Sequence, residues 1–369
     1  MFRFALFETI SERHPGSWQN WPTSLRRPDS PEAAAYARDH AGRIVYHQYL
    51  QYLCDQQLAE ASVHGGLEIG FIRDLAVGCA PDGAEAWAAG DAVAHGVSVG
   101  APPDPFSAEG QVWGLPPPVP HLMAADGYSS FAGLLRANMR HAGGLRIDHA
   151  MGLARLFWVP EGARGADGTY VRYPFEDLLG QLALESARAR ALVIGEDLGT
   201  VPPGLREAMH DNDILSYRVL LLEREGRGFK PRSSYPSRAV ACVSTHDLPT
   251  FAGWLSGADI DERAALGQSQ HPEAEHAGRA QEIDALRKKL ATHEDLTAAA
   301  PGFVAKTPAD LVYVQADDLA GELQAVNLPG TDRERPNWRR RLALPLDQIF
   351  ENPLASAILA RLQSRKAPP

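Results

Sequence analysis

The sequence contains few cysteines and none of the common metal-binding or phosphate-binding motifs. Cys54, Cys79 and Cys242 are the only cysteines among 369 residues, and a small odd number without paired spacing does not build a disulfide framework. No CxxC or HExxH pattern occurs and the 13 histidines are scattered, so we expect no metal site and no cofactor. A GxGxxG or GxxxxGK[ST] loop is also lacking, which disfavours a nucleotide-binding doubly wound sheet.

A basic surface and long apolar segments are lacking as well. The formal net charge is −10 with a pI of about 5.7, which argues against non-specific binding to nucleic acid or anionic membranes. No run reaches the roughly 18 apolar residues that cross a bilayer, and residues 1–18 are too polar and acidic for a signal peptide. With 44% hydrophobic and 22% charged residues, the composition predicts a soluble, cytoplasmic globular protein with a neutral ligand.

Six short apolar runs are present, and each ends in polar or acidic residues. Continuous apolar runs of this length are typical of strands that are buried on both faces of a parallel sheet. The runs are Leu67–Asp74, Leu145–Asp148, Ala191–Asp197, Tyr217–Glu223, Ala239–Asp247 and Leu311–Asp317.

Helical patterns lie before and between these runs. They cover residues 31–65, 175–190 and the start of a helix at 205–209, and a charged block at 272–300 predicts a helical insertion at about 256–300. Alternating strands and helices predict a parallel α/β architecture. Acidic residues at the ends of successive strands favour a (β/α)8 barrel, which builds its active site there. Six strands are found where a closed barrel needs eight.

Three acidic clusters follow the predicted strands, at Arg146–His149, Gly195–Asp197 and Thr245–Asp247. Cleavage of a glycosidic bond needs such a set, because one carboxylate attacks or stabilises the anomeric carbon and a protonated carboxyl releases the leaving oxygen. Different surroundings give the two working carboxyls different pKa values. The alternative for each cluster is a buried ion pair or a helix cap.

Alternation along a strand places Arg146 and Asp148 on the same face. A guanidinium next to a carboxylate favours the ionised form, which a nucleophile requires. We therefore expect Arg146 to hold Asp148 as an anion.

The segment Gly100–Pro118 combines a restricted backbone with two aromatic residues that could face a ligand. Pro102, Pro103 and Pro105 restrict its backbone. Phe106 and Trp113 offer flat apolar faces on which sugar rings stack, and Gln111 offers a polar group. Burial of both aromatic rings in the core is the alternative.

The combination of motifs resembles the bacterial amylomaltases, which are 4-α-glucanotransferases distantly related to the α-amylases. The resemblance rests on GLRIDHAMGLARLFWVP, YPFEDLLGQLALES, VIGEDLGTVP and STHDLPTFAGW, with FIRDLAVG and SVGAPPDPFSAEGQVWGLPP before them and NLPGT and PNWRRRL after them. It covers nearly the whole chain and is weakest around residues 256–300. It implies one partial catalytic barrel domain over residues 1–369.

The resemblance also implies roles for individual residues. Asp148 would be the nucleophile of a retaining double displacement, Glu196 the general acid and base, and Asp247 the residue that holds the hydroxyls of the distorted sugar. The two catalytic carboxyls would lie roughly 5–5.5 Å apart. The segment Gly100–Pro118 would cover the site and exclude water. Further substrate-binding or supporting residues would be Asp74, Asp104, Phe106, Gln111, Trp113, Arg146, His149, Asp197, His246 and Asn327.

The sequence departs from the family at its beginning. Family members start with about two further barrel strands, which carry an NP-containing strand end and an SPYS-like loop, and neither motif is present. The expected activity is transfer of α-1,4-glucan segments between malto-oligosaccharides, without metal or cofactor. Alternatives are a retaining α-glucan hydrolase and an inactive fragment that only binds glucan.

Overall fold

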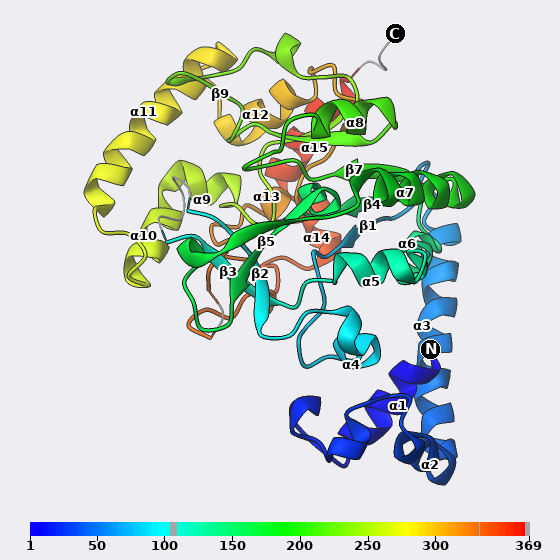
Figure 1. Cartoon of the computed structure of the whole chain (residues 1–369). Coiled ribbons are helices and arrows are strands. Elements are labelled where there is room, and N and C mark those ends of the chain that lie inside the picture. The colour runs from blue at the N-terminus through cyan, green and yellow to red at the C-terminus, as the bar shows by residue number, and fades with distance from the viewer. Residues whose placement is uncertain (104–108, 332, 366–369) are drawn as a thin grey trace. The chain divides into compact units, whose positions relative to one another are not determined.

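The computed structural model describes residues 1–103, 109–331 and 333–365 (Figure 1). The chain divides into two compact units, Met1–Ile214 and Leu215–Pro369. Each unit has its own set of parallel strands and its own hydrophobic core.

The first unit contains two sheets. Its parallel strands pair in the order β1 (Ile72–Leu75), β4 (Gly144–Ile147) and β7 (Leu192–Gly195). An antiparallel sheet has the order β3 (Gln111–Leu115), β2 (Val97–Ala101), β5 (Arg155–Pro160) and β6 (Thr169–Arg172). All four residues of β4 are buried, as expected for a central strand of a parallel sheet that is covered on both faces.

Helices α6 (Ser129–Met139) and α7 (Phe175–Ala189) lie side by side and α6 contacts β1 and β4 (Figure 1). The amphipathic pattern of α7 buries Leu178, Leu179 and Leu182 in the main core of the unit. Helix α8 (Leu205–Asp211) adds Leu205 and Met209 to the same core. Helices α7 and α8 fall where the sequence predicts helices, whereas α6 was not predicted. The short helix α5 (Pro120–Ala125) contacts α6, and the short helix α4 (Ala84–Ala89) contacts the first helix of the chain, Phe2–Ser11.

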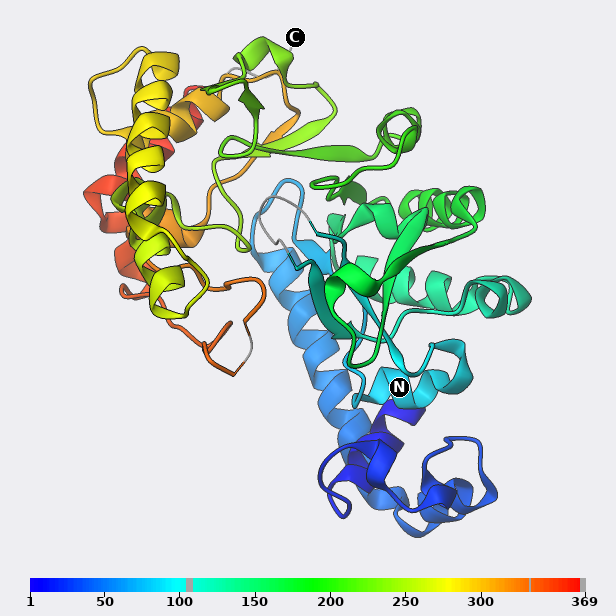
Figure 2. The ribbon, with the colours of Figure 1, turned by 60° about the vertical axis from the view of Figure 1, so that its left-hand side comes forward.

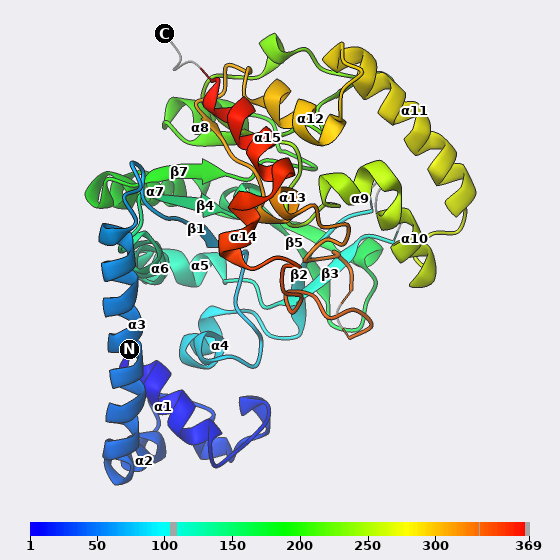
Figure 3. The same ribbon diagram turned by 180° about the vertical axis from the view of Figure 1, so that it is seen from behind.

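A separate small core is built by the first helices, α1 (Phe2–Ser11), α2 (Pro31–Asp39) and α3 (Ala41–His64), of which α1 and α2 pack on α3 (Figure 3). Trp21 and Trp87 are its largest buried side chains. The single helix predicted for residues 31–65 is two helices, because the chain leaves the helical conformation at His40.

The second unit has a parallel sheet with the order β8 (Leu215–Val219), β11 (Ala239–Cys242) and β12 (Leu311–Val312), and a small hairpin of β9 (Arg224–Glu225) and β10 (Gly228–Phe229). β11 is buried at every residue. It is the middle strand of this sheet, as β4 is in the first unit.

Seven helices belong to the second unit. They are α9 (Phe251–Ser256), α10 (Ala258–Ala265), α11 (Pro272–Leu290), α12 (Leu296–Val304), α13 (Ala316–Ala320), α14 (Leu346–Glu351) and α15 (Pro353–Gln363), counted over the residues that the structure describes. The long α11, with Leu286 as its one buried residue, extends next to α12 (Figure 2). Among the described residues, no helix combines the length and the apolar composition of a membrane span.

The six predicted parallel strands are all present, three in each unit, so this part of the sequence prediction is confirmed. The antiparallel sheet was not predicted. The segment Gly100–Pro118, for which no strand was predicted, contains the end of β2 and the whole of β3. β1 is more exposed than predicted, with Ile72 42% exposed, because within the described residues it pairs on one side only.

A close approach of two backbones fixes the start of β4. A Cβ added to Gly143 would lie 1.4 Å from the carbonyl oxygen of Ile69, while the Gly143 amide donates to the oxygen of Phe71 at 2.8 Å and its carbonyl accepts from Leu192 at 2.9 Å. The contact partner is backbone, so it cannot move aside without disturbing the β1–β4–β7 pairing.

We expect Gly143→Ala to lower the free energy of unfolding by about 3 kcal/mol, because an overpacked methyl group must displace the chain at Ile69. Gly133→Ala is the matched control, since Gly133 lies in α6 with open space around it and alanine in a helix adds about 0.5–1 kcal/mol. Urea unfolding measures both values. Equal stability of Gly143→Ala and the wild type would contradict the close contact.

Candidate active site

Arg146 brings two strand-end carboxylates together. Arg146 lies opposite Asp74 in the β1–β4 register. Its Nη1 is 2.6 Å from Asp74 Oδ1 and its Nη2 is 2.9 Å from Asp148 Oδ1. The Arg146 side chain is 10% exposed, whereas those of Asp74 and Asp148 are 45% and 32% exposed. A buried guanidinium at these distances favours an anionic carboxylate, and Asp148 stays accessible to a substrate.

Glu196 follows β7 as Asp148 follows β4, and it is held by two backbone amides. Oε2 accepts a hydrogen bond from the His149 N–H at 2.9 Å, and Oε1 accepts one from the Leu198 N–H at 2.7 Å. The Glu196 main chain donates to Ile147 O at 3.0 Å and accepts from Ala150 N at 2.9 Å. The carboxyl group therefore has a fixed position beside the turn that carries Asp148.

Burial raises the pKa of Glu196 from its ordinary value of 4.5 to about 7, and the negative charge of Asp148 adds to this rise. The two amide hydrogen bonds and the Arg146 charge lower the pKa, but burial outweighs them. Near neutral pH the side chain is therefore divided between its acid and carboxylate forms. A group of this kind both gives and takes a proton at little cost.

His149 shapes the turn between these two carboxyls. Its backbone has φ = 51°, in the left-handed region, and this conformation directs its amide to Glu196. The imidazole meets the Trp113 ring edge-on, with ring centroids 5.2 Å apart. Burial, followed by the Arg155 charge, lowers the pKa of His149 to about 4, so the ring is neutral over the physiological range.

Trp113 and Gln111 are joined within β3, where the indole Nε1 donates to Gln111 Oε1 at 2.9 Å. Trp113 is half-buried and packs against the main core of the unit, and its contact with a sugar stays a prediction. The predicted site residues Asp104 and Phe106 lie outside the described residues.

Asp197, which was predicted to bind substrate or to support the site, has the surroundings of a supporting residue. Its side chain is 0% exposed, and its Oδ2 is 2.7 Å from Arg206 Nε. Arg206 Nη2 also donates to the Asp197 main-chain oxygen at 2.8 Å. A fully buried carboxylate in an ion pair with α8 supports the loop after β7 and presents no surface to a sugar.

In the second unit, Asp247 is held by His246 and Asn327. Asn327 Nδ2 donates to Asp247 Oδ1 at 2.7 Å, and His246 Nε2 lies 3.1 Å from Asp247 Oδ2. Asp247 keeps a side-chain exposure of 41%. The carboxylate is oriented by two neighbours and still faces solvent, as a sugar-binding group requires.

Buried polar contacts fix the loop that carries Asp247. The Asp247 amide donates to Thr245 Oγ1 at 3.2 Å, and Ser244 Oγ donates to Pro249 O at 2.6 Å. Asp318 accepts from the Phe251 amide at the start of α9 at 2.8 Å, and burial raises its pKa to about 6. These contacts tie both ends of the loop to the second unit.

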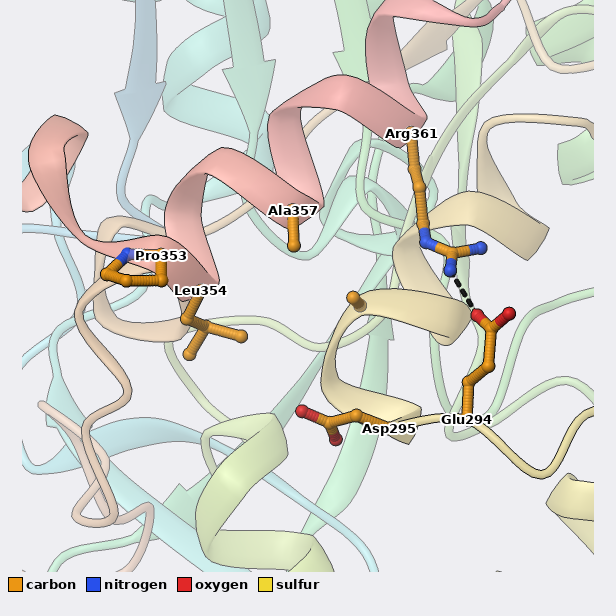
Figure 4. Close-up of a pocket in the computed structure, with 7 residues that line it drawn as sticks. Glu294, Asp295, Pro353, Leu354, Ala357 and Arg361 are labelled. Atoms are coloured by element: carbon orange, nitrogen blue, oxygen red, sulfur yellow. Dashed lines mark hydrogen bonds and ion pairs between the residues drawn. The ribbon is translucent and has the colours of Figure 1, made fainter.

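A pocket of about 420 Å³ lies between α12 and α15 (Figure 4). Arg361 of α15 faces Glu294, with which it forms an ion pair, and Asp295 and apolar side chains of both helices line the rest. None of the predicted site residues lines this pocket. In the described ranges, no group of three or more His, Cys, Asp or Glu side chains is arranged to hold a metal ion.

Sequence analysis missed two features of these sites. The Leu198 amide that binds Glu196 is a main-chain group, for which the sequence carries no signal. Trp338 lies in the quoted PNWRRRL motif without an assigned role, and its ring centroid is 5.2 Å from that of His246. A tryptophan among arginines and next to a Pro-Asn pair, outside any apolar run, was the available signal.

The raised pKa of Glu196 makes a prediction for stability. The folded chain binds the proton more tightly than the unfolded chain, so this contribution is present below about pH 4.5 and is lost as the pH rises through about 7. Glutamine in Glu196→Gln has no acidic proton to lose and stays neutral at both pH values. We expect its stability relative to the wild type to rise by about 3 kcal/mol between pH 4.5 and pH 8.

Urea unfolding at both pH values measures this change, with Glu60→Gln on the exposed face of α3 as the control. The side-chain amide that replaces the Glu196 carboxyl faces one donor N–H unfavourably at either pH, so the change with pH is the informative quantity. A constant difference between wild type and variant would contradict the buried, proton-binding carboxyl.

Comparison with known proteins relates this geometry to one family. A family model described as 4-alpha-glucanotransferase matches residues 1–346. The chain is 37% identical over 392 aligned residues to the 4-alpha-glucanotransferase of Mycobacterium tuberculosis, covering 99% of this chain and 54% of the relative. It is 35% identical over 367 aligned residues to the 4-alpha-glucanotransferase of Haemophilus influenzae, and this match covers 93% of this chain and 52% of the relative. The chain thus spans about half the length of these curated relatives.

Solved structures show the same fold. The crystal structure of amylomaltase from Corynebacterium glutamicum superposes with a TM-score of 0.84 at 34% identity, covering 98% of this chain and 54% of that one. Amylomaltase from Streptococcus agalactiae in complex with acarbose gives a TM-score of 0.79 at 18% identity, and the match covers 98% of this chain and 71% of that one. The predicted fold class, a partial (β/α) barrel of the amylomaltase type with helical insertions, is confirmed. The chain belongs to the 4-alpha-glucanotransferase family.

Proposed function

We propose that this chain transfers α-1,4-glucan segments between malto-oligosaccharides with retention of configuration. The observation that supports the proposal is that two neighbouring carboxyls have different surroundings. Asp148 is paired with the Arg146 guanidinium, whereas Glu196 is buried and its pKa is raised to about 7. One is suited to be an anion and the other to carry a proton, as the retaining mechanism requires. The family match supplies the substrate class.

In the first step Asp148 attacks the anomeric carbon of the donor, and the bond from that carbon to the glycosidic oxygen breaks. Protonated Glu196 gives its proton to the departing oxygen, so the leaving glucan is released with a neutral hydroxyl group. The product is a covalent ester between Asp148 and the glycosyl unit, with Glu196 now a carboxylate.

In the second step the Glu196 carboxylate takes a proton from the hydroxyl of an acceptor glucan, whose oxygen attacks the same carbon. The ester bond breaks and Asp148 is regenerated as an anion. Two inversions give net retention. The amides of His149 and Leu198 hold the Glu196 oxygens in place for both transfers.

We assign Asp247 to the hydroxyl groups of the sugar at the reacting carbon, oriented by His246 and Asn327. The family match supports this assignment. Hydrogen bonds that tighten as the ring distorts stabilise the transition state more than the ground state. The mechanism assigns no step to a metal or a cofactor, and location in the cytoplasm stays a prediction.

Asp148→Asn should reduce turnover of maltotriose to background, because a neutral amide is a poor nucleophile and forms no stable ester. The measurement is incubation of the purified chain with maltotriose and separation of the products by length. Asp91→Asn is the matched control, since Asp91 is 84% exposed at the surface, and it should leave the ladder of products unchanged.

The wild-type product pattern decides among the alternatives. Glucose with a ladder of longer malto-oligosaccharides supports transfer, whereas glucose and maltose alone would indicate a hydrolase. A folded chain that binds maltotriose without converting it would be an inactive glucan binder. Normal turnover in Asp148→Asn would refute the assignment of the nucleophile.

The pH dependence of kcat/KM should show a decline as the pH rises through about 7, because Glu196 loses the proton that the first step needs. Glu196→Gln should lack this decline and turn over about 10² to 10⁴ times more slowly. A malto-oligosaccharyl fluoride, whose leaving group needs no proton, should restore formation of the glycosyl-enzyme in the variant. Equal impairment with the fluoride would argue against Glu196 as the acid.

A further inference from the structure

Trp338 is the most exposed tryptophan of the chain. It is 61% exposed, whereas the other six tryptophans are buried or half-buried. A large apolar surface in water is unfavourable, so an indole exposed on a loop needs an explanation other than packing.

The backbone at Trp338 is strained as well. Its φ is 59°, in the left-handed region, which is uncommon for a residue with a bulky side chain. Strain of this kind persists only where the surroundings enforce it, and it gathers at ligand-binding sites. A glycine at this position would adopt the same backbone conformation without this strain.

The surroundings of Trp338 do enforce it. The Trp338 amide donates to Val326 O at 3.0 Å. Asn337 accepts from the Leu328 amide at 3.1 Å and donates to Thr331 O at 3.0 Å. Arg335 is buried, with its Nε 2.9 Å from Glu262 and its Nη2 2.5 Å from Ala325 O. The ends of this segment are thus cross-linked, and the indole is presented from a fixed frame.

The indole lies beside the Asp247 group. Its centroid is 5.2 Å from that of His246, with 57° between the ring planes, and His246 is paired with Asp247 at 3.1 Å. Asn327, which orients Asp247, precedes the segment that Asn337 cross-links. One frame therefore carries both a polar group for sugar hydroxyls and an exposed flat apolar face.

From these observations we propose that Trp338 is a glucan-binding platform, which stacks on the apolar face of a glucosyl ring next to the one that Asp247 holds. The inference deepens the proposed function and rests on it. Aromatic side chains with an apolar face and a polar tip suit a ligand that has C–H faces and hydroxyl edges. The platform adds affinity for longer chains and takes no part in bond cleavage.

Trp338→Gly is the informative variant, because glycine adopts φ = 59° readily and leaves the backbone of the loop intact while it removes the ring. We expect KM for maltotetraose to rise about three- to tenfold with kcat nearly unchanged, the range for loss of one aromatic stacking contact. Trp338→Tyr should recover most of the affinity. Phe350→Ala removes another exposed aromatic, 56% exposed on α14, and serves as the control.

Quenching of tryptophan fluorescence by acrylamide gives a readout that does not depend on turnover. Maltotetraose should protect the fluorescence of the wild type from the quencher, because the bound glucan would cover the exposed indole of Trp338. The protection should be smaller in Trp338→Gly and Trp338→Tyr, which lack this indole.

The outcomes separate the two proposals. A wild type without transferase activity, tested on the same substrate, removes the proposed function and the platform with it. An active wild type whose KM and quenching match those of Trp338→Gly overturns the platform alone. A fall in kcat with unchanged KM, or a lower Tm of Trp338→Gly than of the wild type, would show that the ring supports the Asp247 loop and does not bind glucan.

Discussion

The pairing of β4 with β7 is the constraint on which the chemistry of the first unit depends. Ile147 lies opposite Gly195 in this parallel register, so the next residue of each strand, Asp148 and Glu196, emerges at the same edge of the sheet. The register continues one step past the strands, because the Glu196 amide donates to Ile147 O and the Ala150 amide donates to Glu196 O. A slip of one residue in either strand would turn the carboxyl of that strand to the other face. The same bonds that build the sheet therefore determine the distance between the two carboxyls.

Two neighbouring carboxyls do different chemistry only if their surroundings differ. Arg146 offers Asp148 a positive charge, whereas Glu196 receives two amide hydrogen bonds inside a buried turn where desolvation dominates. Asp148 itself raises the pKa of Glu196, so ionisation of the first favours protonation of the second. This arrangement lowers the stability of the folded chain whenever Glu196 is ionised, because burial disfavours the charged form of a carboxyl. Active sites commonly carry such a cost.

Much of this arrangement could be predicted from the sequence, since continuous apolar runs that end in acids marked all six parallel strands and, with them, Asp148, Glu196 and Asp247. The antiparallel sheet could not, because its strand β3 is interrupted by Gly114 and is exposed on alternate residues, and so lacks the continuous apolar run of a buried strand. Asp197 shared the strand-end signal of Glu196, yet its neighbour Arg206 comes from the following helix and pairs with it in full burial. A strand-end acid in sequence does not distinguish these two environments. Tertiary contacts do.

Residues with a left-handed backbone conformation are the part of the site that is hardest to predict from the preferences of residue types. His149 and Trp338 both have positive φ, and in both the amide that this conformation exposes is used, by Glu196 Oε2 and by Val326 O. Glycine would give the same main-chain hydrogen bonds with less strain. The backbone alone therefore does not account for histidine at one turn and tryptophan at the other. Both rings are set against a neighbouring aromatic, Trp113 and His246, which points to the rings themselves as the reason that the strain is kept.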